Sequence, residues 1–265
     1  MFSVVVTQTL SQRCRALWGW SLGVATTTML IGLLWPMIRD IPDLTGMLEN
    51  YPPELKELFN VDAIGTPQGF LNAEYFSLLG PLLFLVFAIA AGARLPAAEE
   101  EQGSLEVLLS TPVSRARLLT AQAAALVASL LLLGVVQLFS LSLTSALFGM
   151  GIGVGGMVSA SLALVLLGAE FGLLALAVGG FTGRRGWALS TASVLAAASY
   201  VFWVATSFVD SLRPWRWLSP MQHAIGSEPL LNGLPVGSVL AMAAVGVIAF
   251  LVAVPAFDRR DLTMA

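Results

Sequence analysis

Charged residues are scarce in this chain. Only 11% of its 265 residues are Asp, Glu, Lys or Arg, while 57% are hydrophobic and the mean hydropathy is +0.84. An ordinary soluble domain carries about 25% charged residues, so this composition excludes one and indicates a protein that lives in lipid. The net charge of -3 and the lack of a basic patch in the sequence give no sign of nucleic-acid binding.

Residue types that carry out site chemistry are equally rare. Cys14 is the only cysteine, which excludes an internal disulfide and a thiolate metal cluster. His223 is the only histidine, and no carboxylate or cysteine follows it at metal-ligand spacing. The sequence has no G-x-x-x-x-G-K-[ST], G-x-S-x-G or H-E-x-x-H motif, and its only lysine is Lys56. We therefore expect no catalytic residue, no metal and no bound cofactor on this chain, which argues against a membrane enzyme.

Long apolar stretches are what the sequence has instead. A spanning helix needs roughly 20 apolar residues, whereas spanning strands show short alternating runs. Because only helices or closed barrels satisfy their backbone groups in lipid, these stretches predict an all-α polytopic membrane protein with six transmembrane helices and both termini on one side. The predicted spans are 17–38, 74–93, 118–147, 157–181, 187–209 and 236–257.

The basic residues give the orientation, since cytoplasmic loops keep Lys and Arg. Nine fall on the side of the termini: Arg13, Arg15, Arg94, Arg115, Arg117, Arg184, Arg185, Arg259 and Arg260. Four fall on the other: Arg39, Lys56, Arg213 and Arg216. We therefore expect a multi-pass protein of the plasma membrane with both termini in the cytoplasm. No cleavable signal peptide is visible, so the first span is expected to be retained.

The whole chain, 1–265, is predicted to be a single transmembrane domain whose non-spanning parts are 1–16, 39–73, 95–117 and 210–235. Residues 1–16 suit either an interfacial helix or a plain extension of the first span. The external segment 39–73 is polar and contains a short helix that begins at Pro52-Pro53. The external segment 210–235 is longer and more apolar than a loop needs, so it predicts short helices, re-entrant or on the surface. Pro81 predicts a kink in the second span, for gating or for packing.

The most informative stretch is the cytoplasmic segment 95–117. After three glutamates and the break at Gly103, Ser104 can cap a short helix on which Leu105, Leu108 and Leu109 share one face. Thr111-Pro112 then predicts the start of the helix that becomes span three. Such a short amphipathic helix can dock on a cytoplasmic partner or lie among the lipid headgroups, and the pattern alone leaves both open.

The run from Glu101 to Arg115, E-x-G-S-x-E-x-L-L-S-T-P-V-S-R, resembles the signature of type-two ATP-binding-cassette exporter permeases. The likeness extends over nearly the whole chain, through the Gly183-Arg184-Arg185 turn and the ending Phe257-Asp258-Arg259-Arg260. Its one departure is Ser104, where threonine is frequent, and both residues can cap a helix.

This resemblance implies that residues 103–111 form a coupling helix that docks on a separate ABC ATPase subunit, which would hold ATP and Mg. It also implies a second permease chain, identical or related. The residues implied to contact the ATPase are Glu101, Gly103, Ser104, Leu105, Glu106, Leu108, Leu109, Thr111, Pro112 and Arg115.

Glu170 stands near the middle of the fourth predicted span. An ionisable group at that depth is costly unless it is paired, neutral or hydrated, so it is a candidate for the transport pathway. It can equally be a protonated group bonded to a neighbour such as Gln137. Glu170 also supports the alternative function, a self-contained ion-coupled secondary transporter or channel, although no inverted repeat is visible.

Overall fold

The structure is a computed structural model that describes residues 2–41, 63, 65–94 and 114–259. These residues form α-helices with short 3-10 and π-helical pieces, and no strand occurs among them. Six helical segments in the described part are long and apolar enough to cross a membrane, which confirms the all-α class and each of the predicted spans. Their bounds are Arg15–Arg39, Pro67–Ala93, Arg115–Leu147, Val154–Thr182, Arg185–Phe208 and Val236–Asp258.

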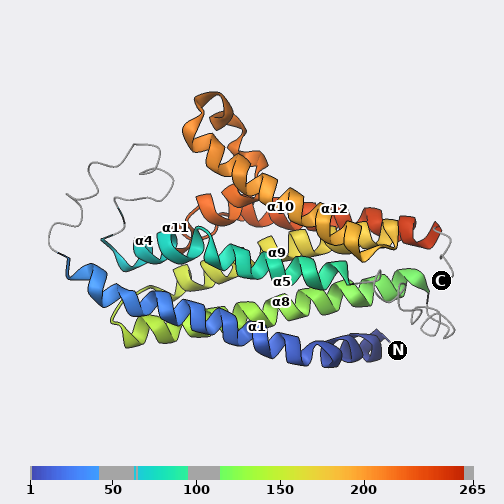
Figure 1. Ribbon diagram of the computed structural model, residues 1–265, viewed down its shortest axis with the longest axis horizontal. Helices are drawn as coiled ribbons and strands as arrows, with labels where there is room; N and C mark the ends of the chain where they lie inside the picture. The colour runs from blue at the N-terminus through green and yellow to red at the C-terminus, as the bar shows by residue number, and fades with distance from the viewer. Residues whose placement is uncertain (1, 42–62, 64, 95–113, 260–265) are drawn as a thin grey trace.

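The long helices lie side by side along the longest axis of the molecule (Figure 1). They are α1 (Phe2–Arg39), α5 (Leu79–Ala93), α8 (Arg115–Leu147), α9 (Val154–Thr182), α10 (Arg185–Phe208) and α12 (Val236–Arg259). The start of α1 and the end of α12 lie at the same end of the bundle, as an even number of spans requires (Figure 1). We call this the terminal end and the other the distal end.

Helix α9 lies at the centre of the packing. It contacts α5, α8, α10 and α12, whereas α1 packs mainly on α8. Two buried apolar clusters follow from this, one reaching from α1 and α8 to α9 and the other joining α5 and α9 to α10. Between α5 and α9 the backbones nearly touch, because a Cβ built on Gly92 would stand 2.1 Å from the carbonyl oxygen of Gly172. Helices α5 and α9 are therefore tightly packed near the terminal end of α5.

The second span is interrupted just before Pro81. It consists of α4 (Pro67–Leu71), the π-helix η2 (Asn72–Phe76) and α5, with a break at Leu78 where φ is -142°. Pro81 falls in the first turn of α5, where the missing N–H has no intrahelical partner in any case. The irregularity precedes Pro81 by three residues, on the side where a proline ring and its missing N–H disturb a helix, so it agrees with the predicted disturbance of this span.

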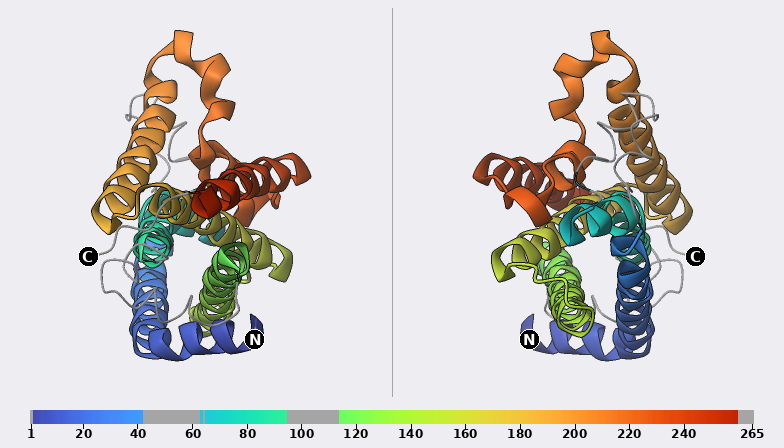
Figure 2. Two further views of the ribbon diagram at one scale, coloured as in Figure 1. Left: turned by 90° about the vertical axis from the view of Figure 1, so that its right-hand side faces the viewer. Right: turned by 90° about the vertical axis from the view of Figure 1, so that its left-hand side faces the viewer.

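Helix α1 is continuous, yet its first turns run across the terminal end of the bundle at a steep angle to the remainder (Figure 2). This arrangement agrees with a helix that turns before entering the first span. The predicted short helix at Pro52-Pro53 lies outside the described residues.

The helix that contains span three begins later than Thr111-Pro112 predicts. Ser114 is the N-cap of α8, and its Oγ accepts a hydrogen bond from the backbone N–H of Arg117 at 3.4 Å. Ser114 offers the same capping chemistry as Thr111, so the predicted start at Thr111-Pro112 is corrected to Arg115. At 33 residues, α8 is about 50 Å long, well beyond the roughly 30 Å core of a bilayer.

Three short helices occupy the segment between α10 and α12, as the sequence predicts. They are the 3-10 helix η3 (Asp210–Leu218), the π-helix η4 (Gln222–Gly226) and α11 (Pro229–Asn232). Helix α11 packs on the start of α9, where a Cβ on Gly156 would stand 2.3 Å from the carbonyl oxygen of Leu230. Between α10 and α12 the chain thus consists of short helical elements rather than of one open loop.

Candidate functional site

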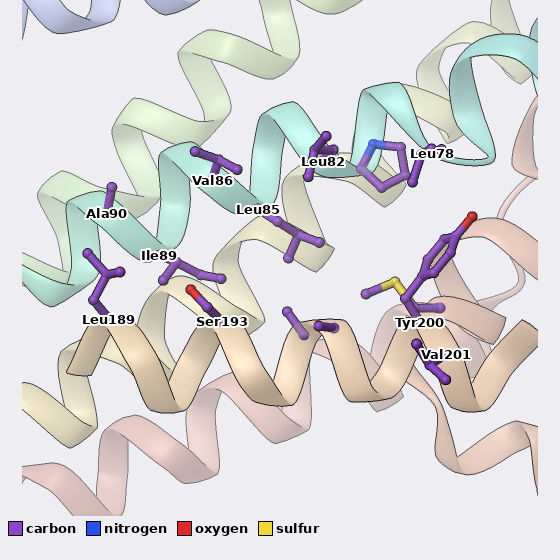
Figure 3. A pocket seen from close by; sticks show the side chains of 14 residues that line it. Leu78, Leu82, Leu85, Val86, Ile89, Ala90, Leu189, Ser193, Tyr200 and Val201 are labelled. Atoms are coloured by element: carbon purple, nitrogen blue, oxygen red, sulfur yellow. The ribbon is translucent and has the colours of Figure 1, made fainter. Parts of the chain in front are cut away.

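An apolar groove runs between α5 and α10 on the side of the bundle (Figure 3). Its volume is about 420 Å³. We call it the α5–α10 groove and define it by Leu78, Pro81, Leu82, Leu85, Val86, Ile89, Ala90, Leu189, Ser193, Ala196, Ala197, Tyr200, Val201 and Met221.

The groove has a buried floor and an exposed rim. Leu85 and Ile89 from α5 are buried, as is Met221, whereas the rim residues Val86 and Val201 are 45% and 65% exposed. In Figure 3 the side chains of the two helices point toward one another across the gap. Since its lining is almost entirely apolar, the groove suits an apolar or amphipathic molecule better than an ion.

Polar groups in the groove are confined to its α10 wall. Ser193 lies at mid-length, and the hydroxyl of Tyr200 lies toward the distal part, near Leu78 (Figure 3). The Tyr200 ring also packs on Trp203, with ring centroids 5.7 Å apart. These two hydroxyls are the groups with which the groove can orient the polar part of a bound molecule.

A buried hydrogen-bond cluster joins three helical elements on the opposite side of α5. The Gln137 Oε1 of α8 accepts from the Tyr75 hydroxyl of η2 at 2.6 Å and from Thr28 Oγ1 of α1 at 3.2 Å. All three side chains are almost fully buried. Because unpaired polar groups are costly in such surroundings, this cluster fixes the register of α1, η2 and α8 against one another.

Glu170 does not line the α5–α10 groove. It lies on the face of α9 that packs against α12, with its Cα 3.3 Å from a Cβ built on Gly246, and it is 3% exposed. The suggested bond to Gln137 is not found, because Gln137 Nε2 and Glu170 Oε2 both lack a hydrogen-bond partner in the described part of the chain. One carboxyl oxygen of Glu170, Oε2, has no hydrogen-bond partner in the described part of the chain.

The predicted ATPase-contact residues Glu101, Gly103, Ser104, Leu105, Glu106, Leu108, Leu109, Thr111 and Pro112 lie outside the described residues. Arg115, the last of the set, is the first residue of α8. Its Nη1 donates to the carbonyl oxygens of Phe257 at 3.4 Å and Asp258 at 3.5 Å. Arginine near a helix C-terminus satisfies the last carbonyls and complements the helix dipole. Arg115 therefore connects the start of α8 with the last turn of α12.

His223 ties the short distal helices together. Its Nε2 lies 2.8 Å from the carbonyl oxygen of Trp217, and its Nδ1 lies 3.2 Å from Ser238 Oγ of α12. Beside it, Gln222 Oε1 accepts from Trp203 Nε1 at 3.1 Å and from Arg216 Nε at 2.9 Å. Across the described residues, no group of three or more His, Cys, Asp or Glu side chains gathers as metal ligands do.

Sequence reasoning missed the groove and the partners of Gln137. A glutamine in an apolar span signals a buried polar contact, but Tyr75 is separated from Gln137 by 62 positions, and no local pattern joins them. Most groove residues lie in the predicted spans and show no distinguishing sequence pattern. They line one groove because α10 lies beside α5 in the fold.

Comparison with known protein families gives one match. The model of a family described as ABC-2 family transporter protein matches residues 4–262, which is nearly the entire chain. A search of curated proteins finds no match.

Proposed function

Because the chain belongs to the ABC-2 family of transporter membrane proteins, we propose that it is the permease subunit of an ATP-driven exporter in the plasma membrane. It forms the translocation pathway, and a separate ABC ATPase subunit binds Mg and ATP and carries out hydrolysis. Members of this family typically lack ATPase activity of their own.

The observation that carries the proposal is the α5–α10 groove. Helices α5 and α9 approach closely at Gly92 and Gly172, so a transported molecule has room beside these helices rather than between them. The groove is open on the side of the bundle and apolar along its length. One chain supplies one wall, and a second permease chain, identical or related, completes the pathway.

The terminal end is the proposed site of the ATPase. The segment 95–113 joins α5 to α8 at this end, and the sequence places most of the arginines on the same side. We take this side as cytoplasmic, with both termini there. The short helix predicted at residues 103–111 would then present Leu105, Leu108 and Leu109 to the ATPase.

Co-purification tests the proposal. The chain, coexpressed with the ABC ATPases of its source, is expected to capture one of them, and assembly is expected to change the rate of ATP hydrolysis. Leu108→Asp places a charge on the apolar face of the predicted helix and is expected to abolish both effects. Co-purification and the ATPase rate measure the outcome.

Ser110→Asp is the matched control, since it adds the same charge on another face of the same predicted helix. It is expected to leave capture of the ATPase intact. If Leu108→Asp assembles a fully functional complex, residues 103–111 do not couple the subunits. Proton-driven transport by the purified chain alone would contradict the exporter assignment itself.

One observation favours the second candidate, an ion-coupled secondary transporter or channel. The buried Glu170 has a carboxyl oxygen without a partner in the described structure, and such a group in a span is a default candidate for carrying protons or cations. Glu170 does not line the α5–α10 groove, which is the proposed pathway. This position favours the exporter over an ion-coupled transporter.

A further inference from the structure

The α5 wall of the α5–α10 groove continues into an arginine. Groove residues four positions apart form a row along this helix, namely Leu82, Val86 and Ala90. The next member of the row is Arg94, the exposed C-cap residue of α5. Residues four apart lie on the same face of a helix, one turn apart. Arg94 therefore follows Ala90 at the terminal end of this wall.

The α10 wall ends in the same way. Read toward the terminal end, its row of groove residues is Val201, Ala197, Ser193 and Leu189. The next member is Arg185, an exposed residue in the first turn of α10. Ala90 and Leu189 lie at the same end of the groove (Figure 3), which we call its terminal mouth. Spans commonly carry basic residues at their cytoplasmic ends, but that rule does not place both arginines in the rows that line one groove.

The terminal mouth lies at the depth of the lipid headgroups. Trp187, two residues into α10, is 59% exposed, and indoles gather at the membrane–water interface. An open hollow at the same place is lined by Arg184, Gly186, Trp187 and Ser190. The described turns here, 90–94 and 184–190, contain no Asp or Glu. The mouth therefore offers positive charge where a headgroup lies.

The groove is about as long as one leaflet is thick. Leu78 and Ala90 are twelve positions apart, as are Leu189 and Val201, which corresponds to about 18 Å of helix. One leaflet supplies about 15 Å of the hydrocarbon core. Inside the groove, the hydroxyls of Ser193 and Tyr200 can orient a neutral polar group but do not offset the burial of a charge. An occupant therefore keeps its charge at the mouth and its apolar part in the groove.

We propose that the α5–α10 groove binds an anionic phospholipid from the leaflet at the terminal end, with one acyl chain along the groove and the phosphate on Arg94 and Arg185. A guanidinium carries five N–H donors and binds phosphate oxygens through paired hydrogen bonds. Basic pockets between membrane helices on the cytoplasmic side bind such headgroups. The inference rests on the proposed function of the groove as a pathway wall, and it names the class of molecule that enters.

Photo-cross-linking of the full chain in nanodiscs of zwitterionic lipid tests this inference without the ATPase. The probe is phosphatidylglycerol with a diazirine at the middle of one acyl chain, and the control is phosphatidylcholine with the same chain. Phosphatidylglycerol is expected to label groove residues such as Val86 and Ser193 several-fold more, because its phosphate has no choline cation to balance it. Equal labelling by the two lipids, or an unlabelled groove, would overturn the proposal and leave the exporter assignment standing.

Arg94→Gln removes one of the two charges and is expected to bring the two lipids to nearly equal labelling of the groove. Arg117→Gln is the matched control, because Arg117 is exposed in the first turns of α8 at the same end and does not line the groove. It is expected to keep the preference for phosphatidylglycerol. A preference that survives in Arg94→Gln, or that is lost equally in both variants, would refute a site at the terminal mouth. Thermal unfolding checks that both variants fold.

A second copy of the chain is the competing occupant of the groove. Val201 lies on the rim and is 65% exposed, so Val201→Cys in a Cys14→Ser background would form disulfide-linked dimers if two grooves faced each other. We expect lipid labelling of the groove and few such dimers. Efficient dimer formation together with an unlabelled groove would overturn the proposal.

Discussion

Glu170 is a carboxyl group packed between α9 and α12. It is 3% exposed, and Oε2 lacks a partner in the described ranges. A charged carboxylate in that position costs several kcal/mol, whereas a neutral amide of the same shape costs little. Gly246 of α12 packs against the backbone of Glu170, so the two helices are close at this position.

We therefore expect Glu170→Gln to keep the thermal stability of the chain and to leave ATP-driven transport and its pH dependence unchanged. Glu170→Ala, which removes a buried side chain and leaves a cavity, is expected to lose about 2 kcal/mol of stability. Thermal unfolding and transport in proteoliposomes measure the two effects. Loss of transport in Glu170→Gln, with normal folding, would instead favour the ion-coupled alternative.

At the scale of single elements, the docking of α11 on α9 depends on one glycine. A Cβ on Gly156 would stand 2.3 Å from the carbonyl oxygen of Leu230, which is backbone and cannot rotate away. The neighbouring Gly155, in the same turn of α9, has nothing within 4 Å of its built Cβ. Replacing either glycine by alanine changes the helix propensity by the same amount, so the two variants differ only in the contacts of the added methyl group.

Gly156→Ala is expected to destabilise the chain by about 1–3 kcal/mol, because α11 must shift to admit the methyl group. Gly155→Ala is expected to stabilise it by about 0.5–1 kcal/mol, since alanine is the better helix former. Thermal unfolding of both variants in the same detergent checks the opposite signs. A Gly156→Ala variant as stable as Gly155→Ala would mean that α11 is not held against α9.

The elements that the sequence predicts well are those set by local composition. The spans follow from apolar length alone, and the two arginines at Arg184-Arg185 correctly mark the turn between α9 and α10, where Gly183 adopts φ 64°. The π-helix η2 has no such signal, since Asn72 to Phe76 reads as the start of an ordinary span. Contacts that join distant segments, as from Tyr75 to Gln137, follow only from the assembled fold.

At the scale of the whole molecule, the α5–α10 groove is a hollow in the side of the bundle, with a packed floor and an open rim. Helix α10 packs on α9 and α5 at the floor, through buried residues such as Ala188 and Ala192, while its rim stays open. A bulky side chain at the rim would occupy the proposed pathway without disturbing this floor.

Ser193→Trp is therefore expected to reduce transport several-fold while ATPase capture and thermal stability stay near wild type. Ser193 lines the groove, whereas Val194 is 65% exposed and does not. Val194→Trp adds the same ring one position along α10 and is expected to transport normally. Equal transport by the two variants would exclude the groove as the pathway wall.

The hydrogen bonds from Arg115 to the last turn of α12 link the movements of α8 and α12 at the terminal end. Arg115 directly follows the segment proposed to meet the ATPase, and its Nη1 reaches the carbonyl oxygens of Phe257 and Asp258. A small displacement of the first turn of α8 carries α12 with it. A larger displacement of α8 breaks these bonds, at a cost of about 1 kcal/mol. The two helices can then separate.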